Sequence, residues 1–398
     1  MPMDSAMDEA LNSTAFAELV LGGFDEKAVQ AAGERGRERL GGNATLAFIF
    51  CTCDYAGSLK DLIELVQIHA RCPHVVGMSA SGLVGVGREE EGEQGFSLLL
   101  LRLPHAEVMT ASLDSDEDSS GEWLRTRQWN EGGCTGWVVL GNPLSLGEDW
   151  MSEWNTHVGR TATYGGLASG SFRAEDLFVF NEHGIQNATA VAVGFRGNVR
   201  LSGLVSQGCR PIGEPLTITR AEQNLIHQLA SKSAYDQLQA AFHSLPETDR
   251  EHAQGNILVG LAMTEYREDF HTGDFLVRSI LGGDPNLGIL AVGATPRTGQ
   301  TLQFQLRDHE AADTELRELL LLKRRELAQS PFAGLLFTCG GRGEQLFGKP
   351  HHDAGLFRDA FGSVPMAGLF CNGEIGTVGE RAYLHGFTAA GVMLVEGG

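Results

Sequence analysis

Apolar stretches of strand length alternate with helical patterns along this chain. Thr45–Cys53 is almost entirely apolar, which predicts a strand buried on both faces. Further on, apolar residues recur at the spacing of one helical face; they are Leu59, Leu62, Ile63 and Val66. His74–Ser79 and Phe96–Arg102 predict two more strands. The segment therefore forms a β-α-β-β unit.

The same order of elements recurs twice, which indicates an internal repeat. In the second copy we expect strands at Gly136–Leu140, Thr163–Ser169 and Leu177–Phe180 and a helix at Glu148–His157. In the third copy we expect strands at Ala333–Cys339, Pro365–Cys371 and Tyr383–Thr388 and a helix at Ala354–Phe361. Three such units predict an α+β protein with mixed sheets covered by helices.

Outside the three copies the pattern predicts further elements. Residues 1–24 have no strong periodicity, and Asp25–Leu40 is a short polar helix. Thr219 and Glu222 have the spacing of a capping box, so a helix is expected to follow and to carry Leu225, Leu229, Leu238 and Phe242. Four strands are expected next, at Ile257–Met263, Phe275–Leu281, Gly288–Val292 and Thr301–Leu306, and then a helix at Glu310–Leu327.

Composition excludes several functional classes. With 398 residues the chain can bury a substantial core in two domains. Its 30 Lys+Arg against 51 Asp+Glu give a net charge of −21, which repels the phosphate backbone of nucleic acids. No apolar run reaches the roughly 20 residues of a membrane span, and the acidic N-terminus does not read as a secretory signal. We therefore expect a cytoplasmic protein that binds no nucleic acid.

The cysteines and three local motifs suggest little chemistry. Seven cysteines without regular spacing predict reduced core thiols. The segment Gly343–Lys349 resembles a phosphate-binding loop, but Pro350 stands where a magnesium-binding hydroxyl is required. His351 and His352 have no second ligand pair at metal-site spacing and are expected at the surface. The Cys-Pro-His sequence at residues 72–74 could in principle ligate haem, but alone it is a weak signal.

Charged residues at the ends of apolar strands are the most informative candidates for a site. They are Arg278, Arg307, Arg342 and Glu374. A charge beside a hydrophobic core must be paired or used. An arginine can hold a carboxylate through two hydrogen bonds, so these residues could line a pocket for a small acidic or zwitterionic molecule. Internal ion pairing is the alternative.

Several modest motifs, in this order, resemble the FIST family, whose name joins F-box and intracellular signal transduction proteins. In the N-terminal half they are Val75–Leu83 and Ser206–Pro215. In the C-terminal half they are Phe275–Leu281, Gly299–Asp308, Phe337–Gly343 and Ala367–Ile375. The resemblance covers about residues 44–393 and implies a two-part architecture. We expect an N-terminal segment with a short helix (1–43), a FIST N-terminal domain (44–220) and a FIST C-terminal domain (221–398).

The resemblance also implies a function. FIST proteins are proposed to be sensory modules that bind small ligands, such as amino acids or their derivatives, and that act on signalling domains. Some bacterial relatives bind haem, and eukaryotic relatives recruit substrates to ubiquitin ligases. Because no kinase, cyclase or F-box segment flanks the domains, we expect a stand-alone sensor whose output passes through a separate signalling partner.

From these patterns we expect a small-molecule ligand in a pocket between the two halves. The residues expected to contact it, or to brace the pocket, are Arg210, Arg307, Arg342, Glu374, Arg278 and Cys209. No cofactor or metal is expected, and no combination of nucleophile, base and orienting residue indicates an enzyme. The alternatives are a haem-binding gas sensor and a protein-interaction scaffold without a small ligand.

Overall fold

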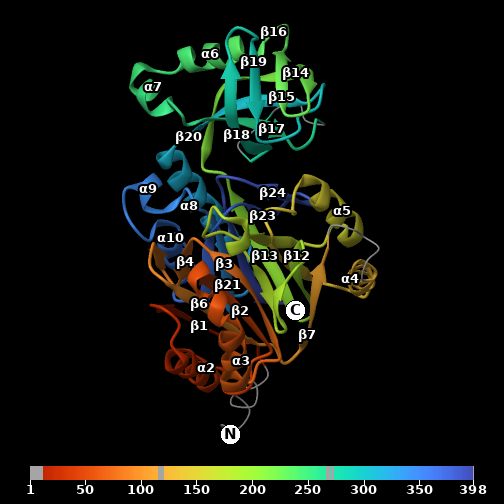
Figure 1. The fold of residues 1–398 in the computed structure, drawn as a ribbon, viewed down its shortest axis with the longest axis vertical. Coiled ribbons are helices and arrows are strands. Elements are labelled where there is room, and N and C mark those ends of the chain that lie inside the picture. Colours follow the sequence, from red (N-terminus) through yellow and green to blue (C-terminus); the bar gives the residue numbers. More distant parts are fainter. Residues whose placement is uncertain (1–11, 115–120, 266–269, 271–272, 398) are drawn as a thin grey trace. The chain divides into compact units, whose positions relative to one another are not determined.

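The computed structural model describes residues 12–114, 121–265, 270 and 273–397, and the chain divides into two compact units. Unit 1 holds residues up to Val205, Arg317–Leu384 and Thr388 onward, while unit 2 holds Ser206–Leu316 and the short segment His385–Phe387. Figure 1 gives the labels of the helices and strands. The α+β class expected from the sequence is confirmed, with several mixed sheets and a barrel.

Unit 1 is built from three copies of one longer motif, an edge strand, a helix, a strand, a helix and four strands. The first copy is β1 (Thr14–Leu21), α2 (Glu26–Leu40), β2 (Leu46–Thr52), a 3-10 turn (Cys53–Ser58), α3 (Leu59–Ala70), β3 (His74–Ala80), β4 (Gly82–Gly85), β5 (Arg88–Glu91) and β6 (Gly95–Arg102). The second is β7 (Ala106–Leu113), α4 (Glu122–Glu131), β8 (Gly136–Gly141), α5 (Glu148–Val158), β9 (Thr163–Leu167), β10 (Val179–Asn181), β11 (Gly184–Gln186) and β12 (Ala190–Gly197). The internal repeat expected from the sequence is therefore present and is longer than expected.

The third copy is split by the residues of unit 2. It consists of β13 (Val199–Ser206), α8 (His309–Glu326), β21 (Ala333–Cys339), α9 (Gly343–Phe347), α10 (His352–Phe361), β22 (Met366–Cys371), β23 (Glu374–Val378), β24 (Arg381–His385) and β25 (Ala389–Glu396). The insertion begins at Ser206, the last residue of β13, and ends at Leu316 within α8, so it separates the edge strand of the repeat from the part of its first helix that belongs to unit 1.

Each repeat contributes its central strands to one six-stranded sheet but sends a hairpin to the sheet of another repeat. The strand orders are β1-β6-β2-β3-β10-β11, β24-β23-β9-β8-β12-β7 and β13-β25-β21-β22-β4-β5. Hairpin β4–β5 of the first repeat thus joins the third sheet, β10–β11 of the second joins the first, and β23–β24 of the third joins the second. The exchange is cyclic, so it ties the three repeats into one body.

Each of the three sheets is mixed in the same way. The strand pairs that flank the second helix of each repeat, β2 with β3, β8 with β9 and β21 with β22, are parallel, as helical crossovers require. The last strand of each repeat, β6, β12 or β25, pairs antiparallel with the first strand of that parallel pair. The three parallel pairs have one register, because Ile49 lies opposite Gly77, Val139 opposite Gly165 and Leu336 opposite Gly368.

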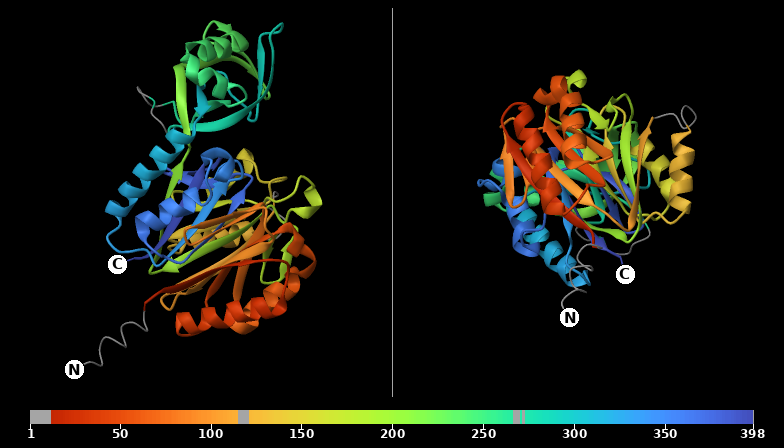
Figure 2. Two further views of the ribbon diagram at one scale, coloured as in Figure 1. Left: turned by 90° about the vertical axis from the view of Figure 1, so that its left-hand side faces the viewer. Right: turned by 90° about the horizontal axis from the view of Figure 1, so that it is seen from below.

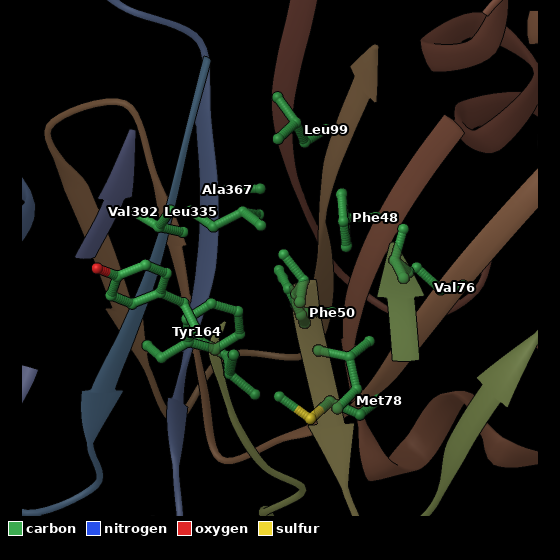
Figure 3. Close-up of a cluster of buried hydrophobic side chains, with 14 of the residues drawn as sticks. Phe48, Phe50, Val76, Met78, Leu99, Tyr164, Leu335, Ala367 and Val392 are labelled. Carbon is green, nitrogen blue, oxygen red and sulfur yellow. The ribbon is translucent and has the colours of Figure 1, made fainter. Parts of the chain in front are cut away.

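The inner faces of the three sheets form one common hydrophobic core. Leu46, Phe48 and Phe50 alternate along β2 toward this core, where the ring of Phe50 meets Phe337 edge to face at 5.8 Å. Figure 3 shows Phe48 and Phe50 with Tyr164, Leu335 and Val392 from the other two sheets. Residues of β2 between them face the other way, under α2 and α3. Burial on both faces explains why this strand is a continuous apolar run.

Helices cover the outer faces of the sheets. Figure 2 shows α2 and α3 side by side against the first sheet. Gly33 of α2 permits this close approach, since a Cβ there would lie 2.9 Å from the Cβ of His69. On the second sheet, α4 and α5 bring Trp123, Trp150 and Trp154 together, with the last two rings stacked at 5.4 Å.

Unit 2 contains a small barrel. Its strands follow the order β14-β20-β17-β18-β19-β15-β16, and β14 also pairs with β15, which closes the sheet. The elements are β14 (Cys209–Glu222), β15 (Leu225–Leu229), β16 (Lys232–Ser233), α6 (Ala234–Ser244), α7 (Glu247–Ala253), β17 (Ile257–Ala262), β18 (Phe275–Asp284), β19 (Ile289–Val292) and β20 (Thr301–Arg307).

Two expectations from the sequence are wrong. Thr14–Leu21, placed in a region without periodicity, forms β1; its residues are nearly all half-buried, so no two-residue alternation marks it. The capping box at Thr219 and Glu222 does not start a helix, because both residues belong to β14 and the next segment pairs as β15 with β14 and β19. The helix begins at Ala234, and the hydroxyl of its N-cap residue Ser233 accepts from the amide of Asp236 at 3.1 Å.

We predict that a methyl group at the shared glycine position will strain the parallel strand pairs. A Cβ on Gly77 or Gly368 would overlap the carbonyl oxygen of Ile49 or Leu336, so the backbone must shift. Gly77→Ala and Gly368→Ala should each lower the free energy of unfolding by about 1–3 kcal/mol in urea titrations. Gly57→Ala, which meets no atom within 4 Å, is the control. Equal stability of all three variants would contradict the register described here.

Candidate functional site

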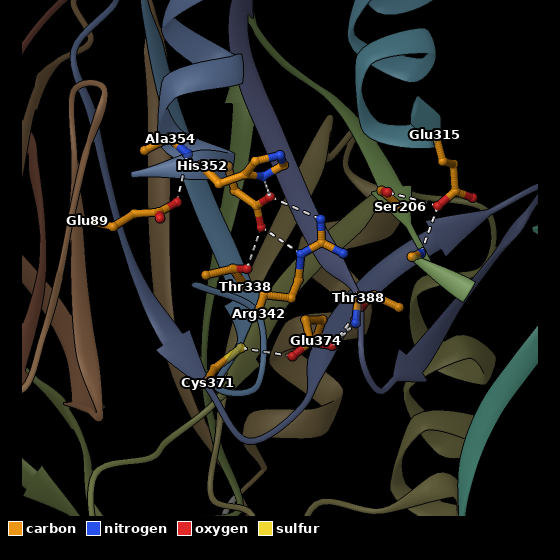
Figure 4. A network of polar contacts seen from close by, with 12 residues as sticks. Glu89, Ser206, Glu315, Thr338, Arg342, His352, Ala354, Cys371, Glu374 and Thr388 are labelled. Atoms are coloured by element: carbon orange, nitrogen blue, oxygen red, sulfur yellow. Dashed lines mark hydrogen bonds and ion pairs between the residues drawn. The ribbon is translucent and has the colours of Figure 1, made fainter. Parts of the chain in front are cut away.

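A buried ion pair forms the centre of a polar network in the third repeat of unit 1. Arg342, in the loop between β21 and α9, donates from Nε to Oδ2 of Asp353 at 2.6 Å and from Nη2 to Oδ1 at 3.0 Å. Asp353 lies in the first turn of α10, and the two side chains are 0% and 1% exposed. This two-bond geometry is the strongest arrangement available to an arginine and a carboxylate (Figure 4).

Neighbouring side chains complete the coordination of Asp353. The Thr338 hydroxyl donates to Oδ2 at 2.9 Å, and Nδ1 of His352 lies 2.9 Å from Oδ1. The His352 ring also stacks on Phe347 with centroids 3.4 Å apart. The expectation that this histidine lies at the surface is therefore wrong, since it is 4% exposed and packs between an aromatic ring and a carboxylate.

Two further carboxyl groups are buried in the same network. Glu89, from hairpin β4–β5 of the first repeat, accepts the amide of Ala354 at 2.8 Å at the start of α10. Glu374, on β23, accepts both the amide and the hydroxyl of Thr388, at 3.1 and 2.7 Å, and the thiol of Cys371 at 3.3 Å. Figure 4 shows Glu374 below Arg342, and Glu89 beside Ala354.

The sequence-derived candidates of unit 2 cluster on the barrel. Arg210 forms ion pairs with Asp249 and, at 2.9 Å, with Asp308. Cys209 lies opposite Arg307 in the β14–β20 register and packs with Leu258, Val277 and Phe387. The Arg307 guanidinium lies over the Phe387 ring at 5.5 Å, and Arg278 is 9% exposed and donates to the carbonyl of Val277. The structure thus groups Arg342 with Glu374 and, separately, Cys209 with Arg307.

A separate cavity of about 860 Å³ lies in unit 1, along the seam between the second repeat and its exchanged hairpin. Hydrogen bonds join strand β7 to hairpin β10–β11, from Thr110 to Glu182, from Ser112 to Gln186 and from Asn181 to Ser112, each at 3.1 Å. Further lining residues come from α4 and from strands β3 and β12; they include His74, Glu122, Arg125, Trp129 and Arg196. The volume suits a small metabolite.

Both signs of charge line this cavity. Nδ1 of His74 lies 3.7 Å from Oε1 of Glu182. Burial acts to raise the pKa of Glu182, but the neighbouring His74, the Glu182 amide and the Thr110 hydroxyl outweigh it and lower the pKa. Arg125 contacts both oxygens of Glu122 at 3.1 Å. The Arg196 guanidinium lies 3.9 Å over the Trp129 ring. The cavity therefore offers carboxyl groups and two guanidinium groups to a polar ligand.

Comparison with protein families agrees with the sequence motifs. The FIST N domain model matches residues 45–232, and the FIST C domain model matches residues 233–377. The chain belongs to the FIST family. FIST domains are associated with sensory signalling.

Relatives of this FIST protein include the uncharacterized protein Rv0628c of Mycobacterium tuberculosis, 33% identical over 93% of this chain and 96% of that protein. The uncharacterized protein Mb0898c of Mycobacterium bovis is 32% identical over 93% of this chain and 96% of its own. An F-box/LRR-repeat protein of Arabidopsis thaliana matches at 32% identity over 25% of this chain and 20% of its own length.

A solved structure of cyanuric acid hydrolase from A. caulinodans aligns with 97% of the FIST protein and 100% of its own chain, at 8% identity and a TM-score of 0.31. That similarity is too low to carry an argument. Among the described residues of the FIST protein, no helix is long and apolar enough to cross a membrane, and no group of three or more His, Cys, Asp or Glu is arranged to hold a metal ion.

None of the six residues chosen from the sequence lines the cavity as the structure describes it. His74 was noted only as a weak haem candidate. Glu182 and Asn181 sit at a three-residue hairpin strand, and Arg125 lies on a helix with little amphipathic pattern. The turn at Asn181–Gly184 could have indicated a hairpin at these residues. It does not indicate a cavity, because the sequence does not reveal which sheet the hairpin joins.

Burial, neighbouring charges and hydrogen bonds shift the pKa values of the carboxyl groups in the buried network. Arg342 and Asp353 neutralise each other; burial acts to raise the pKa of Asp353, but Arg342 and His352 outweigh it and hold that pKa well below its usual range. Burial raises the pKa of Glu89 to about 7, and Asp353 adds to the shift. Burial likewise raises the pKa of Glu374 to about 7, against the opposing hydrogen bonds from Thr388. Each is therefore neutral below that pH.

We predict that Asp353→Asn will destabilise the FIST protein by about 3–5 kcal/mol, since it leaves the Arg342 charge buried without its carboxylate. Chemical denaturation would measure this change. Arg160→Gln breaks a pair with Glu380 whose side chains are 77% and 62% exposed, and it should cost less than about 1 kcal/mol. Similar losses in the two variants would refute the special role of the buried pair.

The two raised carboxyl pKa values predict a pH-dependent stability. The folded protein holds these protons up to about pH 7, whereas the unfolded chain releases them near 4.5, so stability falls as pH rises between these values. Glu374→Gln removes one such group. The difference in free energy of unfolding between this variant and the wild type should therefore shift in favour of the variant from pH 5 to pH 8, by on the order of 3 kcal/mol. Thermal unfolding at both pH values tests this, and an unchanged difference would contradict the buried, neutral state.

Proposed function

We propose that this FIST protein is a cytoplasmic sensory protein that binds a small zwitterionic ligand, such as an amino acid or a derivative, and signals through a separate protein partner. The cavity at the β7 and β10–β11 seam carries the proposal. Its volume of about 860 Å³ fits such a ligand, and its walls present Glu182 and Arg125 as groups of opposite charge.

The hydrogen-bonding groups of the cavity match a ligand with both donors and acceptors. Ser112, Asn181 and Gln186 are linked to one another by hydrogen bonds, and the Thr110 hydroxyl donates to Glu182. We expect a ligand ammonium to bind beside Glu182. We expect a ligand carboxylate to bind beside Arg125, which can donate to it in place of Glu122. Apolar side chains are few, namely Val108, Met109, Trp129 and Ala188, so the cavity favours a polar ligand over haem.

The buried network and the barrel cluster have supporting roles in this proposal. Arg342 is paired with Asp353 through two hydrogen bonds and is completely buried, so it holds the third repeat together. Arg210 is engaged by two carboxylates in unit 2. Arg307, Arg278 and Cys209 are candidate contacts for a partner or ligand of unit 2. Mutations at these residues would distinguish a site on the barrel from a site in the cavity of unit 1.

A thermal-shift screen of amino acids and related metabolites tests the proposal. A ligand at 100 times its dissociation constant should stabilise the protein by about 2.7 kcal/mol. Ala188→Trp fills the cavity and should abolish the shift, whereas Ile185→Trp places the same ring on an exposed position of the same hairpin and should leave it intact. Glu182→Gln should weaken binding at least tenfold, because the ammonium loses its charged partner.

Other outcomes would point elsewhere. A shift that survives Ala188→Trp but is lost in Arg307→Gln would move the ligand site to the barrel. A Soret band after incubation with haem, lost in His74→Ala, would replace the proposal with gas sensing. A silent screen together with one stable protein partner in pull-downs would favour the scaffold alternative.

A further inference from the structure

Two cysteines lie directly opposite each other at the ends of adjacent parallel strands in the third repeat. Cys339, the last residue of β21, is the register partner of Cys371, the last residue of β22. Neighbouring strands lie about 4.8 Å apart, and side chains at paired positions point to the same face of the sheet. A disulfide joins Cα atoms separated by about 4.4–6.8 Å. The two thiols, which are reduced in the structure, therefore have the backbone spacing of a disulfide.

Backbone hydrogen bonds already hold the two strand ends together within unit 1. The amide of Gly340 donates to the carbonyl of Cys371 at 3.0 Å, and the amide of Cys339 donates to the carbonyl of Thr388 at 2.9 Å. A disulfide can therefore close by rotation of the two side chains, without a movement of the strands. The fold itself does not require cysteines here, because the same step of the register in the first repeat pairs Thr52 with Ala80.

The surroundings of the two thiols differ. Cys339 is half-buried, so a small oxidant can reach its sulfur. Cys371 is 1% exposed, and its thiol donates to Oε1 of Glu374 at 3.3 Å (Figure 4). Burial, and after it the charges of Glu374 and Cys339, raises the pKa of the Cys371 thiol well above its usual range. Cys371 therefore keeps its proton until a reaction partner forms beside it.

We propose that Cys339 and Cys371 form a peroxide-sensitive dithiol site, in which Cys339 is oxidised first and Cys371 then closes a disulfide with it. Disulfides in a reducing compartment are usually transient and redox-sensing. Such a site gives a sensory protein a second input, which goes beyond the proposed ligand binding and does not depend on it.

The first step oxidises the accessible sulfur. The Cys339 thiolate attacks one oxygen of hydrogen peroxide, so that an S–O bond forms, the O–O bond breaks and hydroxide leaves. The hydroxide takes up the proton that the thiol has released and becomes water. The product is a sulfenic acid on Cys339.

The second step uses the buried thiol. The sulfur of Cys371 attacks the sulfur of the sulfenic acid, and its proton passes to Oε1 of Glu374, the oxygen that already accepts it in a hydrogen bond. The S–S bond forms as the S–O bond breaks, and the departing hydroxide becomes water with the proton that Glu374 returns. In total two thiols and one peroxide give one disulfide and two waters.

Peptide mapping of the full-length protein by mass spectrometry tests the site. After brief treatment with hydrogen peroxide and blocking of the remaining thiols, trypsin should release residues 326–342 joined to residues 359–381, with the loss of two hydrogens. Each of these peptides contains a single cysteine. Dithiothreitol should separate them. If Cys339 and Cys371 stay thiols while other cysteines, such as the neighbours Cys51 and Cys53, are oxidised, the proposal is wrong.

Two single substitutions test the order of the steps. Cys371→Ser should leave a sulfenic acid on Cys339 that dimedone traps, whereas the wild type should give little adduct because the disulfide removes the sulfenic acid. Cys339→Ser should leave Cys371 as an unmodified thiol, since peroxide does not reach it directly. A dimedone adduct on Cys371 in Cys339→Ser would overturn the assigned order.

The role of Glu374 has its own test. Glu374→Gln can still accept a hydrogen bond but cannot take up the proton, so disulfide formation should slow by at least about tenfold. Glu89→Gln is the matched control, because this buried carboxyl bonds the amide of Ala354 and not the thiol; it should react at the wild-type rate. Equal rates in the two variants would remove Glu374 from the reaction. The wild-type mapping needs no substitution, so it remains decisive if a variant does not fold.

Discussion

The pairing of each exchanged hairpin with the sheet of another repeat is the interaction on which the structure of unit 1 depends. Gly82, Leu83 and Val84 of the first repeat pair with β22 of the third, more than 280 residues away, and the other two hairpins make equivalent pairings. These contacts occupy what would otherwise be the open edges of the parallel strands β3, β9 and β22. The three sheets therefore enclose one common core, because each sheet contains strands from two repeats.

The exchange also creates the two features that carry chemical interest. Where hairpin β10–β11 joins the first sheet, its polar side chains line the cavity together with β7 and α4 of their own repeat and with His74 of the first repeat. Where hairpin β4–β5 meets α10, Glu89 reaches the start of that helix beside Asp353. Buried carboxyls cost stability unless they are paired or neutral, so the repeat interface holds charges that ordinary core packing would exclude.

Local pattern predicted the elements of the repeats well, because strands such as Thr45–Cys53 are apolar throughout and end in small residues. It failed where pairing partners decide the outcome. Leu225 and Leu229 have helical spacing, yet the segment is a strand because β14 and β19 are available on both sides. The hairpin exchange could not be derived, since β4 and β10 are only four and three residues long and carry no code for a distant partner.

The site shows the same division between local and distant information. Arg342 and Glu374 were recognised as charges at strand ends, and the structure places both in one buried network. Asp353, the partner of Arg342, was not among the residues predicted for the site, because a helix start gives no sign of what covers it. Glu182 and Arg125 were missed because the cavity exists only after two repeats have joined.

The most direct test of this account is a crystal structure of the protein purified without denaturation, or soaked with a ligand from the screen. The account predicts density for a small molecule between β7 and hairpin β10–β11, with one end beside Glu182 and the other beside Arg125. A ligand bound on the barrel, with the cavity filled by solvent alone, would contradict it.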